Sequence, residues 1–285
     1  MIIVDLNQVM LSNLLMQLGN HTNAQLEENM VRHMILNSIR SYRVKFGAEY
    51  GELVIACDNT NIWRKKVYPY YKANRKKNLE KSEMDWKAIF DCLSKIRSEL
   101  KEYFPYKVID VESAEADDVI GTLVNKFGSE LNTGEKILVL SGDKDFIQLH
   151  TYANVSQYDP TRKKWIKNSD PVRYLKEHIL KGDSGDGVPN VLSDDDTFVT
   201  NKRQKPMTAK RIEEFLKQDP NLYDGKIFKN WQRNKELIDL TNTPDYIKEQ
   251  VLTQFNEQSG KNRSKLLNYF IANKMKHLIE HLSEF

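Results

Sequence analysis

The stretch Ile137-Leu-Val-Leu-Ser-Gly-Asp-Lys-Asp145 joins a short apolar run to a turn that carries two aspartates. Three other apolar runs are equally brief and do not alternate with polar residues: Ile2 to Val4, Leu53 to Cys57, and Tyr106 to Ile109. Between them, apolar residues recur three and four positions apart, as in amphipathic helices. Buried strands separated by helices predict an α/β fold, with a central, mainly parallel sheet flanked by helices.

The chain has 285 residues, 40% of them hydrophobic, which suffices for one large domain and a smaller appendage. After about Tyr158 the pattern becomes helical and polar. We therefore expect an α/β domain over residues 1–180 and a smaller helical domain over residues 181–285. No run of 18 apolar residues occurs, so we expect neither a membrane span nor a secretory signal. Cys57 and Cys92 lack disulfide or zinc-site spacing, which favours a reducing, intracellular setting such as the cytoplasm.

Acidic residues follow all four apolar runs. Asp5, Asp58 and Asp143 come at or just after three of them, where the carboxyl ends of parallel strands face the functional crevice. The fourth run precedes Glu115-Ala-Asp-Asp118, which opens a helix. At 100° per residue, Glu115 and Asp118 should lie on its polar face and Asp117 nearer the sheet. Asp145 and the glycine-rich turn with Asp183 and Asp186 add three more carboxylates.

So many carboxylates in one crevice would repel one another and raise their pKa values unless cations neutralise them. Oxygen ligands without imidazole or thiolate select Mg²⁺ or Mn²⁺ over zinc. Two such ions, roughly 3.5–4 Å apart, suit the activation of a water and the stabilisation of a leaving phosphodiester oxygen. Taken singly, each aspartate is also explained as a helix cap, a turn residue or a partner of a helix dipole. Asp110, Glu112 and the triplet Asp194 to Asp196 are assigned such local roles.

A basic stretch follows the strand that leads to Asp58. Net charge is only +3, but eight basic residues face one acid between Thr60 and Ser82. Aromatic residues interleave with these cations, and such a pattern suits stacking on bases and contact with phosphates. The alternative is an exposed basic helix with core-packed tyrosines. The candidate contacts are Arg64, Lys65, Lys66, Tyr71, Lys72, Arg75, Lys76 and Lys77.

Six motifs in order resemble the structure-specific 5′ nucleases, the flap endonuclease and 5′–3′ exonuclease family, and within it the T-even phage ribonuclease H branch. They are Asp5, Cys57-Asp-Asn59, Tyr71-Lys-Ala-Asn-Arg75, Glu115-Ala-Asp-Asp118, Ser141-Gly-Asp-Lys-Asp145 and Gly182-Asp-Ser-Gly-Asp186. The resemblance implies a PIN-like core, a basic helical arch over residues 60–103, and two divalent metal ions.

The resemblance also implies roles for individual residues. Lys72 and Arg75 would act from the arch on the scissile phosphate, Tyr71 would stack on the terminal base, and Asp117 and Asp143 would be central to catalysis. The first ion would be held by Asp5, Asp58, Glu115, Asp117 and Asp143, and the second ion or its waters by Asp118, Asp145, Asp183 and Asp186.

The activity implied is removal of RNA primers during DNA replication, 5′–3′ degradation of duplexes, and cleavage at 5′ flaps. The partners implied are DNA and RNA·DNA duplexes with 5′ ends or flaps, and a single-stranded-DNA-binding protein at the C-terminal helices, for a phage-encoded monomer in the host cytoplasm. The backbone of the duplex would be gripped by Lys202, Lys205, Lys210 and Arg211.

Two departures from the family pattern limit these implications. The second glycine-rich turn reads Gly185-Asp-Gly-Val-Pro-Asn190 in place of the usual Gly-Asp-Asn-Ile-Pro-Gly, and a polar insertion follows it. The monovalent-cation site that often accompanies this motif in the family is therefore left open. The phage relatives can engage a sliding clamp through residues ahead of the first strand, and with a strand starting at Ile2 we do not expect clamp binding by that route.

Two other functions remain open on the sequence. A metal-dependent phosphatase or a toxin-type ribonuclease also places aspartates at the edge of a parallel sheet. Neither accounts for a run of cations interleaved with aromatic residues, and a phosphatase of small molecules has no use for it. A non-catalytic DNA-binding module is the other alternative, against which stands the presence of every acid of the motifs.

Overall fold

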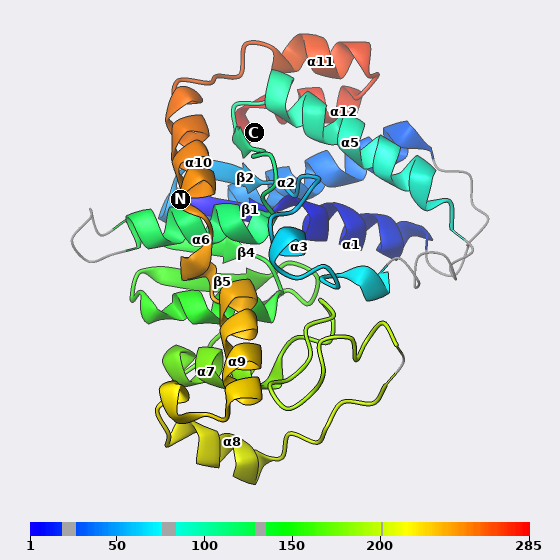
Figure 1. Cartoon of the computed structure of the whole chain (residues 1–285). Helices are drawn as coiled ribbons and strands as arrows, with labels where there is room; N and C mark the ends of the chain where they lie inside the picture. The colour runs from blue at the N-terminus through cyan, green and yellow to red at the C-terminus, as the bar shows by residue number, and fades with distance from the viewer. Residues whose placement is uncertain (19–26, 76–83, 129–134, 201) are drawn as a thin grey trace.

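The computed structural model describes residues 1–18, 27–75, 84–128, 135–200 and 202–285. A six-stranded sheet in the order β3-β2-β1-β4-β5-β6 forms the centre of the molecule (Figure 1). All neighbours in it are parallel except β5 and β6. The strand order reverses between β1 and β4, and the carboxyl ends of strands at such a point form a crevice. The strands are β1 (Ile2–Asp5), β2 (Leu53–Ala56), β3 (Lys107–Ile109), β4 (Ile137–Leu140), β5 (Val155–Asp159) and β6 (Lys164–Ile166).

The four expected strands are present, whereas β5 and β6 were not expected. The prediction that the chain turns helical and polar after about Tyr158 is wrong at β6. Gln157 explains why β5 escapes notice, because it is a buried amide in the middle of a strand. Its Nε2 donates to the carbonyl oxygens of Ser141 and Asp143 at 2.9 and 2.6 Å. A polar residue whose hydrogen bonds are satisfied can replace an apolar one in a core, and this hides the strand pattern.

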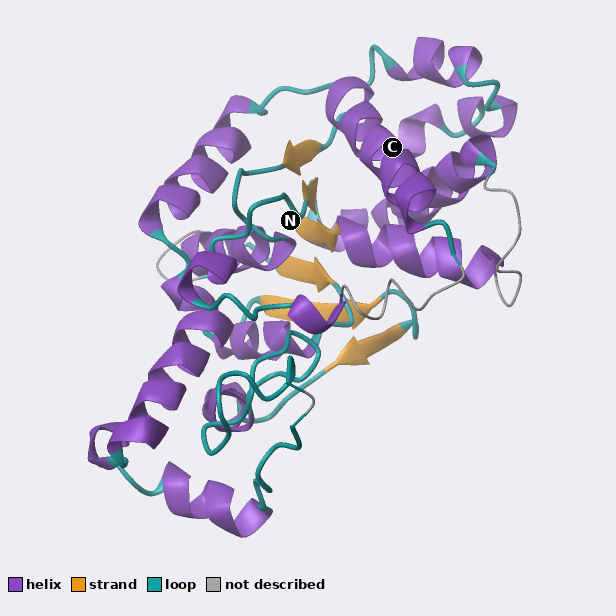
Figure 2. Cartoon of the chain, turned by 45° about the vertical axis from the view of Figure 1, so that its right-hand side comes forward, coloured by secondary structure: helices purple, strands orange, loops and turns teal. Residues whose placement is uncertain are grey.

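Helices cover both faces of the sheet, as expected (Figure 2). Ile2 and Val4 of β1 point into one core and Ile3 into the other, in keeping with the alternation of side chains along a strand. The helices of the first face are α1 (Leu6–Leu18), α2 (Glu28–Tyr50) and α5 (Trp86–Tyr103), and those of the second are α6 (Ala116–Phe127) and α10 (Asp245–Glu257).

The C-terminal part divides between a lobe and the sheet. In Figure 1, α7, α8 and α9 lie below the sheet, while α11 and α12 lie above it. Val251 of α10 belongs to the second core, and Phe270 of α11 and the terminal Phe285 belong to the first. The expected unit of residues 181–285 is helical, but its last helices are built into the sheet's own cores. These elements are α7 (Pro171–Lys181), α8 (Ala209–Leu216), α9 (Gly225–Ile238), α11 (Leu266–Ala272) and α12 (Lys276–Ile279), with 3-10 turns η1 (Lys144–Thr151), η2 (Pro220–Leu222), η3 (Leu240–Asn242) and η4 (Leu282–Glu284).

The expected arch is shorter than residues 60–103. Helix α5 buries Ile89, Leu93 and Ile96 against the sheet, so it is a core helix and does not bridge the crevice. The short helix α3 (Arg64–Val67) and residues up to Arg75 do reach the crevice. Residues 76–83 lie outside the described part of the chain. Within the described ranges, no helix has the length and apolar character needed to cross a membrane.

Candidate functional site

Four carboxylates that lie far apart in the sequence meet at the carboxyl ends of the strands. Asp5 ends β1, Asp58 follows β2 and Asp143 follows β4. Asp117, in the first turn of α6, faces the same crevice and is acted on electrostatically by Asp143. Asp58 and Asp143 act in the same way on Asp5. The structure thus brings together the four residues that the sequence grouped from their places after strands.

Hydrogen bonds fix the innermost carboxylates. Asp5 accepts from the backbone N of Gln8 at 3.2 Å and from Ser141 Oγ at 3.1 Å. Asp58 Oδ1 accepts from the backbone N of Ala116 at 2.7 Å, and its Oδ2 accepts from Asn7 at 2.5 Å. Each carboxylate therefore links its own strand to a neighbouring element and is held in one orientation.

The pKa values of three of these groups are raised. Burial, followed by the charge of Asp58, raises the pKa of Asp5 to about 7. Desolvation of its carboxyl group, followed by Asp145, raises the pKa of Asp143 to about 6. Burial and Asp143 raise the pKa of Asp117 well above its usual range. The raised pKa values mean that the protein does not neutralise the negative charge of these three carboxylates. Hard divalent cations bind such oxygen ligands and would supply the missing positive charge.

A second group of acids is already neutralised. Asp118 is fully buried, and its oxygens accept from Arg64, from Trp63 Nε1 at 3.1 Å and from Thr243 Oγ1 at 2.9 Å. Glu115, 2% exposed, accepts from Arg64 at 2.9 Å and from Lys72 Nζ at 2.5 Å. The expected polar face of α6 is in fact covered by α3 and η3. In this structure the oxygens of Asp118 face protein donors rather than the open crevice, and Glu115 is engaged by protein cations.

Arg64 and Tyr71 correct the expected nucleic-acid surface. Arg64 is 2% exposed and donates to the carbonyl oxygen of Leu237 at 2.9 Å besides its two carboxylates. Tyr71 is 3% exposed, and its hydroxyl lies 3.0 Å from Glu115 Oε2 and 2.7 Å from Asp186 Oδ2, so its single proton is shared between the two carboxylates. Neither side chain can reach a base or phosphate in this structure. The burial of Tyr71 agrees with the alternative of a core-packed tyrosine, and its stacking on a base stays a prediction.

The glycine-rich turn closes the crevice opposite α6. Gly182 has a φ of +65°, and a Cβ there would collide with the backbone of the turn, so this position requires glycine. Asp183 Oδ1 accepts from the backbone N of Gly185 at 2.7 Å, which shapes the turn. Asp186 pairs with Lys72 at 3.4 Å and with Arg75 at 2.5 Å. Burial opposes its ionisation, but these two cations hold the pKa of Asp186 below its usual range.

Lys72 and Arg75 therefore lie where the resemblance implied, at the crevice. The backbone N of Lys72 donates to the carbonyl oxygen of Asp186 at 2.7 Å, which ties the base of the arch to the turn. Lys72 has a φ of +57°, an uncommon backbone conformation for a residue with a side chain. Its side chain is 15% exposed, whereas that of Arg75 is 56% exposed.

His178, on the last turn of α7, was not among the residues that sequence patterns pointed to. Its Nε2 lies 3.0 Å from Asp145 Oδ1 and 3.8 Å from Asp183 Oδ2. Burial opposes its protonation, but Asp145 raises the pKa of His178 above its usual value. Its position, four residues before Gly182 and thus one helical turn back from the crevice, was the available signal.

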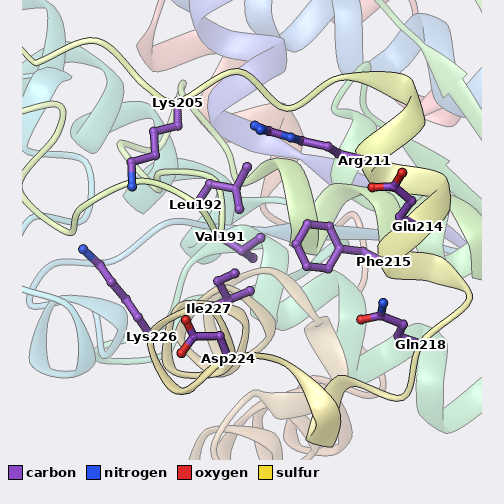
Figure 3. Close-up of a pocket in the computed structure, with 10 residues that line it drawn as sticks. All are labelled: Val191, Leu192, Lys205, Arg211, Glu214, Phe215, Gln218, Asp224, Lys226 and Ile227. Carbon is purple, nitrogen blue, oxygen red and sulfur yellow. The ribbon is translucent and has the colours of Figure 1, made fainter.

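The remaining basic residues of the expected nucleic-acid surface lie in two places, on α3 and near the cavity between α8 and α9. Lys65 and Lys66 are exposed on α3. Lys205 and Arg211 line a cavity of about 480 Å³ between α8 and α9 (Figure 3), and Lys202 and Lys210 are exposed near it in sequence. Helix α8 begins after Thr208. The expected contacts Lys76 and Lys77 lie outside the described residues.

Residues 3–179 match the family model of the 5′–3′ exonuclease N-terminal resolvase-like domain. Residues 172–285 match that of the C-terminal part of T4 RNase H. The ribonuclease H of Enterobacteria phage T4 is 36% identical over 296 aligned positions, which cover 99% of this chain and 95% of that protein. Flap endonuclease Xni of Shewanella woodyi is 33% identical over 137 positions, or 45% of this chain and 49% of that protein.

Solved structures show the same fold. A T5 5′-exonuclease with bound divalent metal ions (zinc) has a TM-score of 0.63 and 18% identity, covering 91% of this chain and 99% of the other. A T5 flap endonuclease in a complex with DNA and metal ions has a TM-score of 0.60 and 17% identity, covering 90% and 98%. Similarity at this identity supports the architecture alone. The chain therefore belongs to the 5′–3′ exonuclease family of 5′ nucleases, and its C-terminal part is of the phage T4 ribonuclease H type.

Proposed function

We propose that the chain hydrolyses phosphodiester bonds near the 5′ ends of DNA and RNA·DNA duplexes, by the combined action of two Mg²⁺ ions that Mn²⁺ can replace. Removal of primers and 5′ flaps during DNA replication is the corresponding role. One observation carries the proposal: Asp5, Asp117 and Asp143 share a crevice and have raised pKa values, while the neighbouring acids are neutralised by protein cations. Divalent cations are the natural counter-charge for the unneutralised set.

The proposed ligands differ from the full set of acids. Asp5, Asp58, Asp117 and Asp143 hold the first ion, and Asp145 and Asp183 hold the second. Asp186 joins them when its cations turn to substrate. Asp118 is excluded because its oxygens are satisfied within the protein. Glu115 anchors Lys72 through a contact of 2.5 Å between Nζ and Oε1, and so positions that cation without binding an ion.

Bound divalent ions supply an activated water and charge stabilisation at the leaving oxygen. The protein's own part is to orient and to neutralise. Asp117 and Asp143 lie at the centre of the carboxylate cluster, and a substrate phosphate placed there is within reach of Lys72 and Arg75 once they release Asp186. These two cations then stabilise the charge that develops on the phosphate.

We further propose that the substrate strand enters past the exposed Lys65 and Lys66, and that the duplex rests on the C-terminal lobe. Lys205 and Arg211 of the cavity in Figure 3, with Lys202 and Lys210, contact the duplex backbone. Such contacts act on phosphates and carry no sequence information of their own. In this proposal residues 1–180 cut and residues 181–285 grip the duplex.

We also propose that the enzyme acts as a monomer in the cytoplasm of an infected host, and that a single-stranded-DNA-binding protein docks on the C-terminal helices. Leu267 and Ile271 of α11 support a docking surface there, because these apolar side chains are 44% and 58% exposed.

The test is incubation of end-labelled flap, nicked and RNA·DNA substrates with magnesium, with product lengths read on a denaturing gel. We expect cleavage near the 5′ end that EDTA abolishes. Asp143→Asn and Asp117→Asn should each remove cleavage and leave DNA affinity largely intact. Asp91→Asn, at an exposed position of the core helix α5, is the matched control and should cut as the wild type does. Full cleavage by either site variant would refute the proposal.

The same assay separates the alternatives. A phosphatase would release phosphate from a generic monoester and leave the flap substrate intact. A non-catalytic module would bind the flap duplex without cutting it at any metal concentration. Cleavage of the flap substrate, with no activity on the monoester, supports the nuclease over both.

A further inference from the structure

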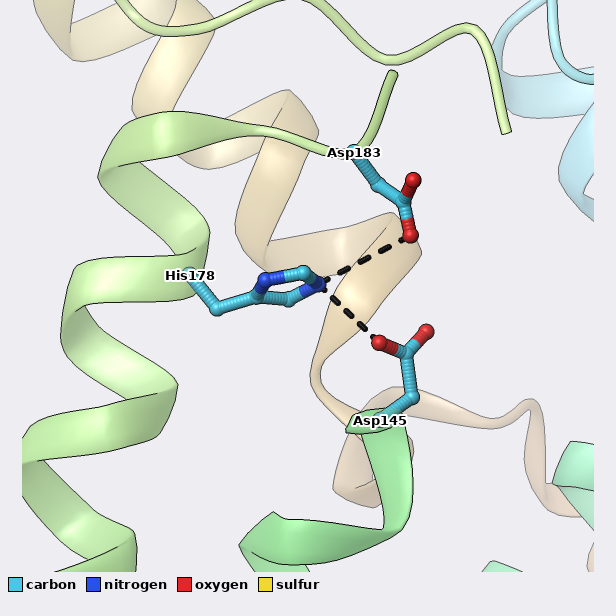
Figure 4. Close-up of side chains that lie close together, drawn as sticks. All are labelled: Asp145, His178 and Asp183. Atoms are coloured by element: carbon cyan, nitrogen blue, oxygen red, sulfur yellow. Dashed lines mark ion pairs between the residues drawn. The ribbon is translucent and has the colours of Figure 1, made fainter. Parts of the chain in front are cut away.

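His178 reaches into the crevice between two aspartates from different elements. It extends from the last turn of α7, Asp183 lies in the turn that follows this helix, and Asp145 comes from η1 (Figure 4). One donor atom from each lies within 4.8 Å of the other two. The three side chains are 15–25% exposed, so the cluster is open to an ion from solvent.

The imidazole is held in place but not satisfied. Its ring stacks on that of Tyr174, one helical turn earlier, with centroids 5.9 Å apart and planes 12° apart. Its Nε2 atom is buried, and among the described residues no group forms a hydrogen bond of good geometry with it, despite the nearby Asp145. A buried polar atom without a partner is rare and calls for an explanation.

The spacing of the donors fits a shared ion. An octahedral ion with bonds of about 2.1 Å separates adjacent ligands by roughly 3 Å. The distances from His178 Nε2 to Asp145 Oδ1 and to Asp183 Oδ2 are 3.0 and 3.8 Å. All three donor atoms lie within 4.8 Å of one another, so a rotation of the Asp183 carboxyl group would bring them closer to one coordination sphere.

The site formed by Asp145, His178 and Asp183 differs from the site proposed for the first ion in the type of its ligand atoms. The ligands proposed for the first ion, Asp5, Asp58, Asp117 and Asp143, are all carboxylates. Imidazole nitrogen suits first-row transition-metal ions, whereas Mg²⁺ prefers oxygen. Mn²⁺ also takes oxygen ligands, but as a transition-metal ion it accepts an imidazole more readily than Mg²⁺ does. We propose that His178 is a direct ligand of the second ion, which makes the Asp145, His178 and Asp183 position bind a transition-metal ion such as Mn²⁺ more tightly than Mg²⁺.

This inference rests on the proposed two-ion function, and it goes further by giving the two positions different metal preferences. The competing explanation is that His178 serves only as a protonated counter-charge to the two aspartates. If His178 is a counter-charge, it opposes metal binding, so removing it would strengthen the binding of both Mn²⁺ and Mg²⁺. If His178 is a ligand, removing it would weaken the binding of Mn²⁺ and leave that of Mg²⁺ nearly unchanged.

The test uses the full-length protein with Mn²⁺ as the probe. Binding of Mn²⁺ and of Mg²⁺ is measured by calorimetry for the wild type, His178→Ala and His178→Gln. Pulsed electron paramagnetic resonance of bound Mn²⁺ then reports whether a nitrogen is coordinated. His277→Gln removes an exposed histidine on α12 and is the matched control. Thermal unfolding of each variant verifies that it is folded.

We expect a nitrogen coupling in the wild type and in His277→Gln, and its loss in both His178 variants. Mn²⁺ should bind at least about tenfold more weakly to these variants, a loss that even outer partners of a metal site can cause. Mg²⁺ affinity should stay nearly unchanged.

Two outcomes would overturn the inference. If the wild type binds two Mn²⁺ ions without nitrogen coupling, or if His178→Ala binds both metals more tightly, His178 is not a ligand and the two-ion function stands. If the wild type binds neither metal, the proposed function fails together with the inference.

Discussion

Arg64 offers a strong test of the structure, because the sequence assigned it to nucleic acid and the structure assigns it to stability. We consider Arg64→Met, which keeps an unbranched apolar stem and removes the charge. The wild-type guanidinium is 2% exposed and donates to Glu115, to Asp118 and to the carbonyl oxygen of Leu237, each at 2.9 Å. The variant leaves two buried carboxylates next to each other without their main cation.

Removing one partner of a buried ion pair destabilises a protein by about 3–5 kcal/mol. At roughly 2 °C per kcal/mol for a chain of this size, the melting temperature should fall by about 6–10 °C. Lys65→Met is the matched control, since Lys65 is the next residue and is exposed. Its free energy of unfolding should stay within about 0.5 kcal/mol of the wild type.

The assay combines urea unfolding, followed by circular dichroism, with anisotropy of a labelled flap duplex at low salt. We expect Arg64→Met to lose stability, and Lys65→Met to keep stability but bind the duplex more weakly, because phosphate contacts are electrostatic. The reasoning would be refuted if Arg64→Met unfolded like the wild type and lost duplex affinity as Lys65→Met does. That result would mean that Arg64 faces the nucleic acid in solution.

Three further predictions concern the crevice. Because the folded-state pKa values of Asp5 and Asp143 are raised to about 7 and 6, the metal-free folded protein binds protons more tightly than the unfolded chain. Its free energy of unfolding should therefore rise as the pH falls from 8 to 5, by up to about 3 kcal/mol from Asp5. Urea unfolding with EDTA measures this, and a flat profile contradicts the shifts. Mg²⁺ competes with the same protons, so its affinity by calorimetry should fall below pH 7, and an unchanged affinity at pH 5.5 would argue against these ligands. Gly182→Ala forces a side chain onto a residue with a φ of +65°, so it should lower the free energy of unfolding by about 1–3 kcal/mol and slow cleavage. Gly225→Ala is the control, because a Cβ there meets nothing within 4 Å, and it should change neither quantity in the same assays. Equal behaviour of the two variants would show that the turn does not need the backbone conformation of Gly182.

Some features could be predicted from the sequence because local rules govern them. Four apolar runs predicted β1 to β4, and the aspartates after three of them predicted the crevice, since the carboxyl ends of parallel strands lie at one edge. The N-terminal turn of α6 followed from the helix periodicity that begins at Ala116. These signals depend on residues close together in the chain, so no tertiary contact was needed to find them.

Other features depended on contacts between distant segments. Helical geometry placed Asp118 on a polar face, but Arg64 and Thr243 cover that face from 54 and 125 residues away. Gln157 disguised β5, because its amide finds partners on the neighbouring turn rather than in its own strand. Periodicity cannot show which element will cover a helix or satisfy a buried amide.

The amino-acid sequence alone determined which residues carry negative charge to the end of each strand, because strand order along the chain and side-chain chemistry are local properties. Only the tertiary structure decided which of these charges remain available. Arg64, Lys72 and Arg75 neutralise one set of carboxylates, and His178 comes to rest against another. Coulomb interactions act over a few ångströms of space and not over positions in a chain, so the division into structural and metal-binding acids arises only on folding.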